Sequence, residues 1–113
     1  MQPLVKLLAS GNEFYIDEGC FVTELSTASE DPLLSIARCR VEPGCMTRWH
    51  RLVDTVERYV IQTGCGLGEI GDLPPQPVTA GDAVLIPAGC RQRIRNTGDG
   101  DLVFLAICTP RFQ

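Results

Sequence analysis

Short apolar segments, separated by closely spaced proline and glycine, run through most of the chain. In residues 34–41, the small side chains of Ser35, Ala37, Cys39 and Val41 alternate with larger ones, which gives an extended chain one small apolar face. Alternation of this kind between frequent turn signals favours an all-β sandwich or barrel and leaves no room for a long helix. We expect strands at residues 20–25, 34–41, 56–62, 67–70, 76–79, 83–86, 91–95 and 102–108.

The last of these segments, residues 102–108, is apolar on both faces. A strand that is covered on both sides is unusual in so small a protein, because one layer of sheet normally faces water. We therefore expect its outer face to pack against a second subunit, so that the protein forms a homodimer.

The length of 113 residues predicts one domain over residues 1–113, with a single modest core. No apolar run approaches the roughly 20 residues that a membrane span needs, and no basic leader precedes the apolar N-terminus, so we expect a cytoplasmic protein without a membrane partner. The net charge of −4 argues against nucleic acid as a partner. The stripe of Arg91, Arg93 and Arg95 has no interleaved aromatic residue, so we expect it to form salt bridges.

The chain contains six cysteines but no C-x-x-C pair, which excludes a zinc ribbon and a thioredoxin-like motif. Without a secretory leader, we interpret them as reduced thiols that pack as small apolar side chains. We expect Trp49 and Arg51 to be packing and surface groups. Glu24 is expected to be a surface carboxylate, with a place in a pocket as the alternative.

Two stretches carry a distinctive spacing. In the first, Gly44 is followed after five residues by His50, then by Leu52, by Glu57 after four more residues and by Gly64 after six. In the second, Gly81 is followed after five residues by Pro87, then by Gly89, by Gln92 after two residues and by Asn96 after three.

This spacing resembles the two signature motifs of the cupin superfamily, with two departures. The family has histidine at the positions of Leu52 and Gln92. The resemblance implies a jelly-roll barrel of the cupin type, also called a double-stranded β-helix. In metal-binding cupins, the two histidines and the glutamate of the first motif and the histidine of the second hold one divalent metal ion.

The residues themselves indicate where these side chains point. Side chains two apart on a strand share a face, so His50 and Leu52 point the same way, with Arg48 joining them if that strand is regular. We expect the interior of the barrel to hold a polar cluster of His50, Glu57, Tyr59 and Gln92. Such a cluster is costly to bury without partners, so it is paired internally, bound to a ligand, or hydrated.

Three interpretations of the cluster stay open. In the first, His50, Glu57 and Gln92 form a reduced site for Fe, Mn, Ni or Zn, and His50, Glu57 and Tyr59 catalyse dioxygenase- or isomerase-like chemistry on a small polar substrate. Leu52 cannot ligate, and a thiolate from Cys45 or Cys90 is a further candidate ligand. In the second, a metal-free cavity binds or senses a small molecule, either without catalysis or with His50 and Glu57 as an acid–base pair. In the third, the cluster is an inert hydrogen-bond network.

Overall fold

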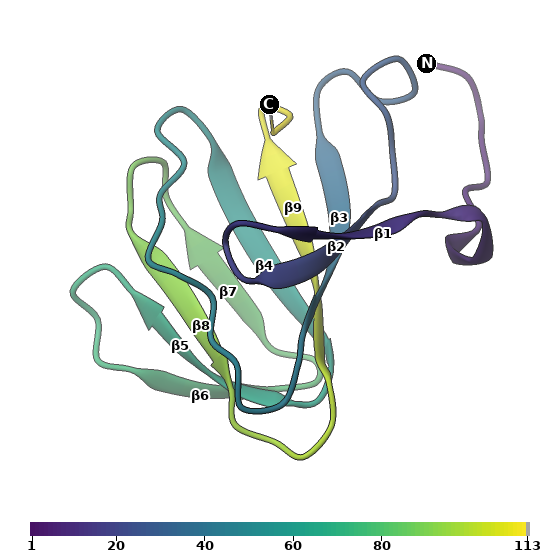
Figure 1. Ribbon diagram of the computed structural model, residues 1–113. Helices are drawn as coiled ribbons and strands as arrows, with labels where there is room; N and C mark the ends of the chain where they lie inside the picture. Colours follow the sequence, from purple (N-terminus) through teal and green to yellow (C-terminus); the bar gives the residue numbers. More distant parts are fainter. Residues whose placement is uncertain (113) are drawn as a thin grey trace.

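The computed structural model describes residues 1–112, and its regular secondary structure consists almost entirely of nine strands (Figure 1). One short 3₁₀ helix, Leu8–Ser10, precedes them. The strands are β1 (Glu13–Ile16), β2 (Cys20–Glu24), β3 (Ser35–Val41), β4 (Val56–Thr63), β5 (Cys65–Ile70), β6 (Gln76–Thr79), β7 (Ala83–Ile86), β8 (Gln92–Asn96) and β9 (Leu102–Thr109).

The strands form two antiparallel sheets, as the sequence pattern predicts. The larger sheet has the order β1-β2-β3-β9-β4-β7, and the smaller has the order β6-β5-β8. Figure 1 shows the smaller sheet facing the curved larger one, with the β1–β2 hairpin reaching across to one side. This is the jelly-roll arrangement of an all-β cupin-type barrel.

The core follows from the alternation of side chains along the strands. Five large apolar side chains of the core are at most 2% exposed: Val41, Ile61, Ile86, Leu102 and Phe104. Burying such a side chain contributes about 1.5–3 kcal/mol relative to leaving it in water. Among residues 1–112, no helix is long and apolar enough to cross a membrane.

The register of the central strands decides which inward side chains meet. Strand β4 pairs with β9 so that Glu57 lies opposite Cys108 and Tyr59 lies opposite Ala106. Strand β3 pairs with the other edge of β9, which places Cys39 opposite Phe104. Glu57 and Tyr59 therefore enter the barrel beside a row of side chains from β9 and β3.

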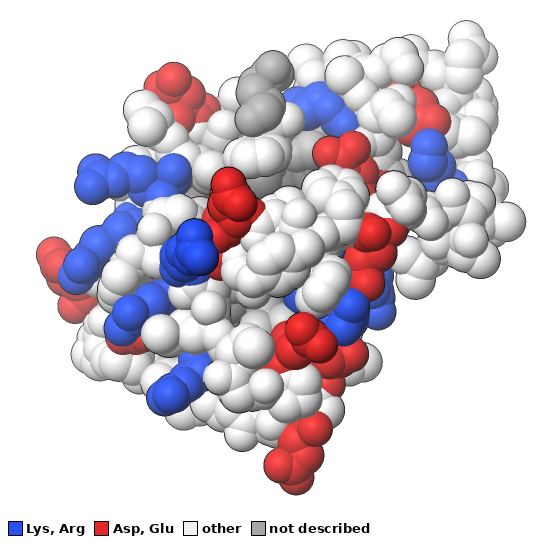
Figure 2. Space-filling view, in the orientation of Figure 1, with Lys and Arg blue, Asp and Glu red and all other residues white. Residues whose placement is uncertain are grey.

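Every strand predicted from the sequence is present, most with ends shifted by one or two residues. Strand β1 was not predicted, because its four residues are largely exposed and extend the sheet only through pairing with β2. The arginine stripe lies on the outer face of β8, on the side where Figure 2 shows basic side chains gathered. Arg93 forms the predicted kind of salt bridge, with Glu69 at 2.6 Å, and Arg91 and Arg93 both stack on the ring of Trp49.

The outer face of β9 is apolar but only partly covered. Val103 is buried, while Leu105 and Ile107 are half-buried and Leu85 on the nearby β7 is 72% exposed. The homodimer predicted from this strand stays a prediction.

Candidate functional site

A cavity of about 160 Å³ lies inside the barrel, between the concave face of the larger sheet and the segment that leads to β4. His50, Leu52, Glu57 and Tyr59 line it, together with Cys108. Of the four polar side chains expected inside the barrel, His50, Glu57 and Tyr59 line this cavity, whereas Gln92 does not.

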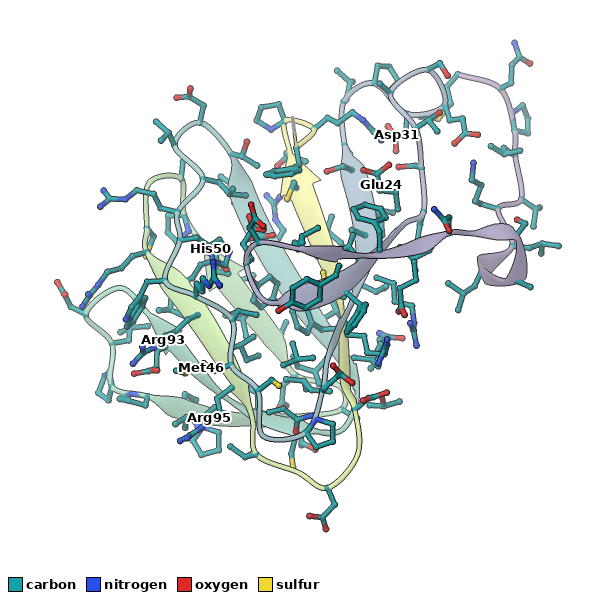
Figure 3. The ribbon with its side chains drawn as sticks, in the orientation of Figure 1. Glu24, Asp31, Met46, His50, Arg93 and Arg95 are labelled. Atoms are coloured by element: carbon teal, nitrogen blue, oxygen red, sulfur yellow. The ribbon has the colours of Figure 1, made fainter. Side chains whose placement is uncertain are left out.

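His50 lies on an irregular segment that is held to β8. Its backbone N–H donates to the carbonyl of Gln92 at 3.1 Å, and the N–H of Gln92 donates to the carbonyl of His50 at 2.8 Å. The ring Nδ1 lies 2.8 Å from the carbonyl oxygen of Arg48. A carbonyl only accepts, so Nδ1 carries a proton, and in the neutral ring Nε2 holds the lone pair. Figure 3 shows His50 on the side of the barrel where β8 runs.

Glu57 is a buried carboxyl, 8% exposed, in the interior of β4. Its Oε1 accepts a hydrogen bond of 2.6 Å from the Gln92 side-chain amide, and its Oε2 lies 3.7 Å from the Cys108 thiol. Burial raises the pKa of Glu57 above its ordinary value, although the Gln92 hydrogen bond and the nearby His50 pull the pKa back. Glu57 is therefore a carboxyl whose protonated form is favoured more than that of an exposed glutamate.

We expect replacement of Glu57 by glutamine to make stability less sensitive to pH. The folded-state pKa of Glu57 lies above its unfolded value, so the wild-type protein loses stability as pH rises from the unfolded value through the folded one. In Glu57→Gln this loss is absent, while the amide oxygen can still accept from Gln92. The free energy of unfolding of the variant should therefore increase relative to that of the wild type as pH rises. Urea unfolding from about pH 4 to 8 measures this difference.

Glu69→Gln is the matched control, because Arg93 lowers the pKa of Glu69 by hydrogen bonding to it. Its stabilising pairing is present above the unfolded pKa and is lost in acid. This variant should therefore have a lower free energy of unfolding than the wild type at neutral pH and the same one in acid. The same pH dependence in both variants would contradict the raised pKa of Glu57.

Gln92 joins Glu57 to Tyr59. It is completely buried; its amide nitrogen donates to Glu57, and its amide oxygen accepts the hydroxyl proton of Tyr59. Burial raises the pKa of Tyr59 well above its ordinary value. Both functional ends of the Gln92 amide are thus occupied by neighbouring side chains, and Tyr59 remains a neutral donor.

The donor set fits a divalent metal ion poorly. Leu52 lines the cavity where a second imidazole would stand, and the oxygen of Gln92 is already bonded to a buried phenol. Among residues 1–112, no three histidine, cysteine, aspartate or glutamate side chains are arranged to hold a metal ion. The orientation of His50 is the one feature that suits a ligand, because metal-binding imidazoles commonly donate through the other ring nitrogen to a carbonyl.

Other expectations have mixed outcomes. Arg48 does not line the cavity, because residues around it form only isolated bridges, so the two-residue periodicity of a strand does not apply. Glu24 is exposed, as expected, and also lines the cavity, which was the alternative. Cys45 is exposed and Cys90 packs against the core, and neither lines the cavity. The roles predicted for His50, Glu57, Tyr59 and Gln92 stay predictions.

Sequence reasoning missed several cavity residues. Cys20 and Cys39 line it from β2 and β3, and Cys108 lies against Glu57. Burial and the neighbouring Glu57 carboxyl raise the pKa of Cys108 to about 12. The alternation of Cys20, Val22 and Glu24 along one strand was a usable signal, but the position of Cys108 depends on the β4–β9 register.

Fold and site together define a small β-barrel protein with a ligand-sized cavity. Residues 37–108 match the family model described as "Cupin domain", more than half of the chain, and the chain therefore belongs to the cupin family. No curated protein matches the sequence.

Solved structures show the same fold. A predicted oxalate decarboxylase from Thermotoga maritima is similar with a TM-score of 0.86 and 23% identity, covering 95% of this chain and 99% of that one. KdgF from Halomonas sp. has a TM-score of 0.83 and 13% identity, covering 95% and 94%. Pac13, a nucleoside dehydratase from Streptomyces, has a TM-score of 0.79 and 19% identity, covering 99% and 86%.

Proposed function

We propose that this cupin binds a small polar molecule in its cavity and moves a proton on it with His50 and Glu57, in isomerisation or elimination chemistry that needs no metal ion. The observation that carries the proposal is the pairing of two unlike groups beside one cavity. In its neutral form His50 presents Nε2 with a lone pair, and Glu57 is a buried carboxyl with a raised pKa.

Such a pair has a base and an acid at the same time. An imidazole nitrogen with a free lone pair can accept a proton from a carbon or hydroxyl group. A carboxyl whose pKa is raised by burial can donate one to a leaving group or to a neighbouring carbon. Gln92 donates to Glu57, and Tyr59 donates to Gln92, so we assign both of them roles in positioning the Glu57 carboxyl.

The comparison structures support this class of chemistry without identifying a substrate. One of them is a nucleoside dehydratase that has been solved with uridine, and dehydration requires an acid and a base on one substrate. Fold similarity alone does not transfer an activity, so the proposal depends on the side chains in the cavity.

The test is proton exchange into candidate substrates in deuterated water. Small neutral hydroxycarbonyl compounds and uridine are incubated with the protein, and deuterium uptake at carbon and loss of hydroxyl are followed by NMR. We expect turnover that EDTA does not affect and that falls by about 10²-fold or more in His50→Asn.

Arg51→Gln is the control, because Arg51 does not line the cavity. Turnover that EDTA abolishes, or that His50→Asn retains, would overturn the proposal.

The second candidate is the reduced metal site of His50, Glu57 and Gln92, holding Fe, Mn, Ni or Zn. It is favoured by the lone pair of His50 Nε2. His50 is the only histidine, so its ring nitrogens give single NMR signals in the labelled protein. Stoichiometric metal in the purified protein, lost in His50→Asn, would favour this candidate over the metal-free one.

The remaining predictions about partners and place are part of the same proposal. A homodimer through the outer face of β9 is supported by half-buried Leu105 and Ile107 and is checked by the molar mass in solution. A cytoplasmic location, without a nucleic-acid or membrane partner, also stays a prediction.

A further inference from the structure

Three carboxyl side chains line the cavity. Glu18 precedes β2, Glu24 ends β2, and Glu57 lies within β4. Glu18 is near enough to Glu57 to raise its pKa further. Figure 3 shows Glu24 near the upper end of β3 and His50 lower in the barrel, so the lining of the cavity extends between these two levels.

The positive side chain in the cavity lining is hydrogen-bonded to the chain itself. Of the described residues, Arg111 is the only lysine or arginine in its lining. Its guanidinium donates to the carbonyl oxygens of Asp31 at 2.6 Å, Leu34 at 2.9 Å and Ser26, and it also contacts the Ser26 hydroxyl. These bonds fasten the C-terminal segment to the β2–β3 connection. They occupy both terminal nitrogens that would otherwise clamp an anion.

His50 does not change this balance. With Nδ1 donating to the Arg48 carbonyl, the neutral ring offers the cavity a lone pair, which an anionic ligand would not approach favourably. When the His50 ring is neutral, the cavity therefore presents three carboxyls and a hydrogen-bond acceptor, and the terminal nitrogens of Arg111, the one arginine in its described lining, are already bonded to the chain.

The size and the remaining lining narrow the ligand further. The volume of about 160 Å³ is close to the roughly 150 Å³ cavity that accommodates benzene. Val22, Ile36, Ala37 and Ala106 give apolar walls, and Phe14 also lines the cavity. A compact carbon skeleton fits such walls, with polar groups directed at the acidic ends.

We propose that the cavity selects an uncharged or cationic molecule about the size of a substituted six-membered ring, and discriminates against carboxylates and phosphates. This selection rests on the proposed function, because it concerns the same cavity. It implies a hydroxylated or amino-substituted ligand whose donors face Glu18, Glu24 or Glu57. It also separates the chain from an enzyme that takes oxalate, since a small dianion would meet three carboxyls and an arginine whose terminal nitrogens already bind backbone carbonyls.

The test uses three probes of one shape and different charge: benzylamine, benzyl alcohol and benzoate. Binding is followed by protein-observed NMR at neutral pH, through the methyl groups of Val22 and Ile36 and the single imidazole of His50. We expect benzylamine and benzyl alcohol to bind at least about tenfold more tightly than benzoate.

Two cavity variants and one matched control sharpen the result. Glu18→Gln and Glu24→Gln should each reduce the preference for benzylamine over benzoate. Glu42→Gln should leave it unchanged, because Glu42 is exposed and lies outside this cavity.

Each outcome is decisive. Benzoate binding as tightly as the other two probes, or a preference that Glu18→Gln and Glu24→Gln do not change, would overturn the charge selection and leave the proposed function standing. If no probe perturbs the cavity signals, the proposed size and charge selection fails, and the proposed function is judged separately by the proton-exchange assay.

Discussion

Introducing histidine at both Leu52 and Gln92 is expected to raise the affinity of this protein for Zn²⁺ or Ni²⁺ by about 10²-fold or more. Leu52 lines the cavity beside His50, and Gln92 pairs with His50 through the backbone, so both new imidazoles would be directed at the same space as Glu57. The apparent free energy of Zn²⁺ binding to four-ligand structural sites is about 10–16 kcal/mol, which is about 3 kcal/mol for each ligand. Replacing Gln92 also releases the Glu57 oxygen that its amide now binds. Calorimetric titration with each metal measures the gain.

Leu52→His alone should raise the affinity for Zn²⁺ or Ni²⁺ at least about tenfold, which corresponds to about 1.4 kcal/mol of binding free energy. Leu85→His is the control, since it adds an imidazole at a position that is 72% exposed and outside the cavity. A gain equal to that of Leu85→His would show that the cavity is not arranged around a metal position at all. A large gain would indicate that this barrel keeps the geometry of a metal site and lacks only the donors.

Gly64→Ala is expected to destabilise the fold by about 3 kcal/mol or more, and to lower Tm by more than about 10 °C. Gly64 joins β4 to β5 with a φ of 85°, which side chains other than glycine adopt at a cost of about 1–2 kcal/mol. A Cβ there would lie 2.6 Å from the carbonyl oxygen of Asp101 and 3.1 Å from the Cα of Leu102. Both are backbone atoms at the start of β9, so relief requires moving a central strand. Urea unfolding measures the loss.

Alanine substitutions at two other glycines distinguish the cost of a positive φ from the cost of a steric clash. Gly81 has a φ of 95°, but no atom lies within 4 Å of the point that an alanine Cβ would occupy, so Gly81→Ala should cost only the conformational part, about 1–2 kcal/mol. Gly100 has neither a positive φ nor a close atom, so Gly100→Ala should change stability by less than about 1 kcal/mol. If Gly64→Ala behaves like Gly100→Ala, the close approach of β4–β5 to β9 is not rigid.

The predictability of the site differs from residue to residue. The motif spacing singled out His50, Glu57 and Gln92, and the interior position expected for Tyr59 agrees with its burial. Periodicity failed for Arg48, because the segment around it is not a regular strand. It also could not find strand β1, whose stability comes from pairing with β2 and not from burial of its own side chains.

The sequence by itself determined the class of fold and the family resemblance, because turn residues and alternation act over a few positions and the motif spacing is read directly from the chain. It also determined that two imidazoles of a metal-binding cupin are absent, at Leu52 and Gln92.

Only the tertiary structure decided what the remaining groups do to one another. That Gln92 is held between Glu57 and Tyr59, that Cys108 lies against Glu57, and that Arg111 is committed to backbone carbonyls all depend on contacts between residues far apart in the chain. Strand register and loop closure set these contacts, and neither is encoded in a local pattern. The charge of the cavity, and with it the class of ligand we propose, follows from that register.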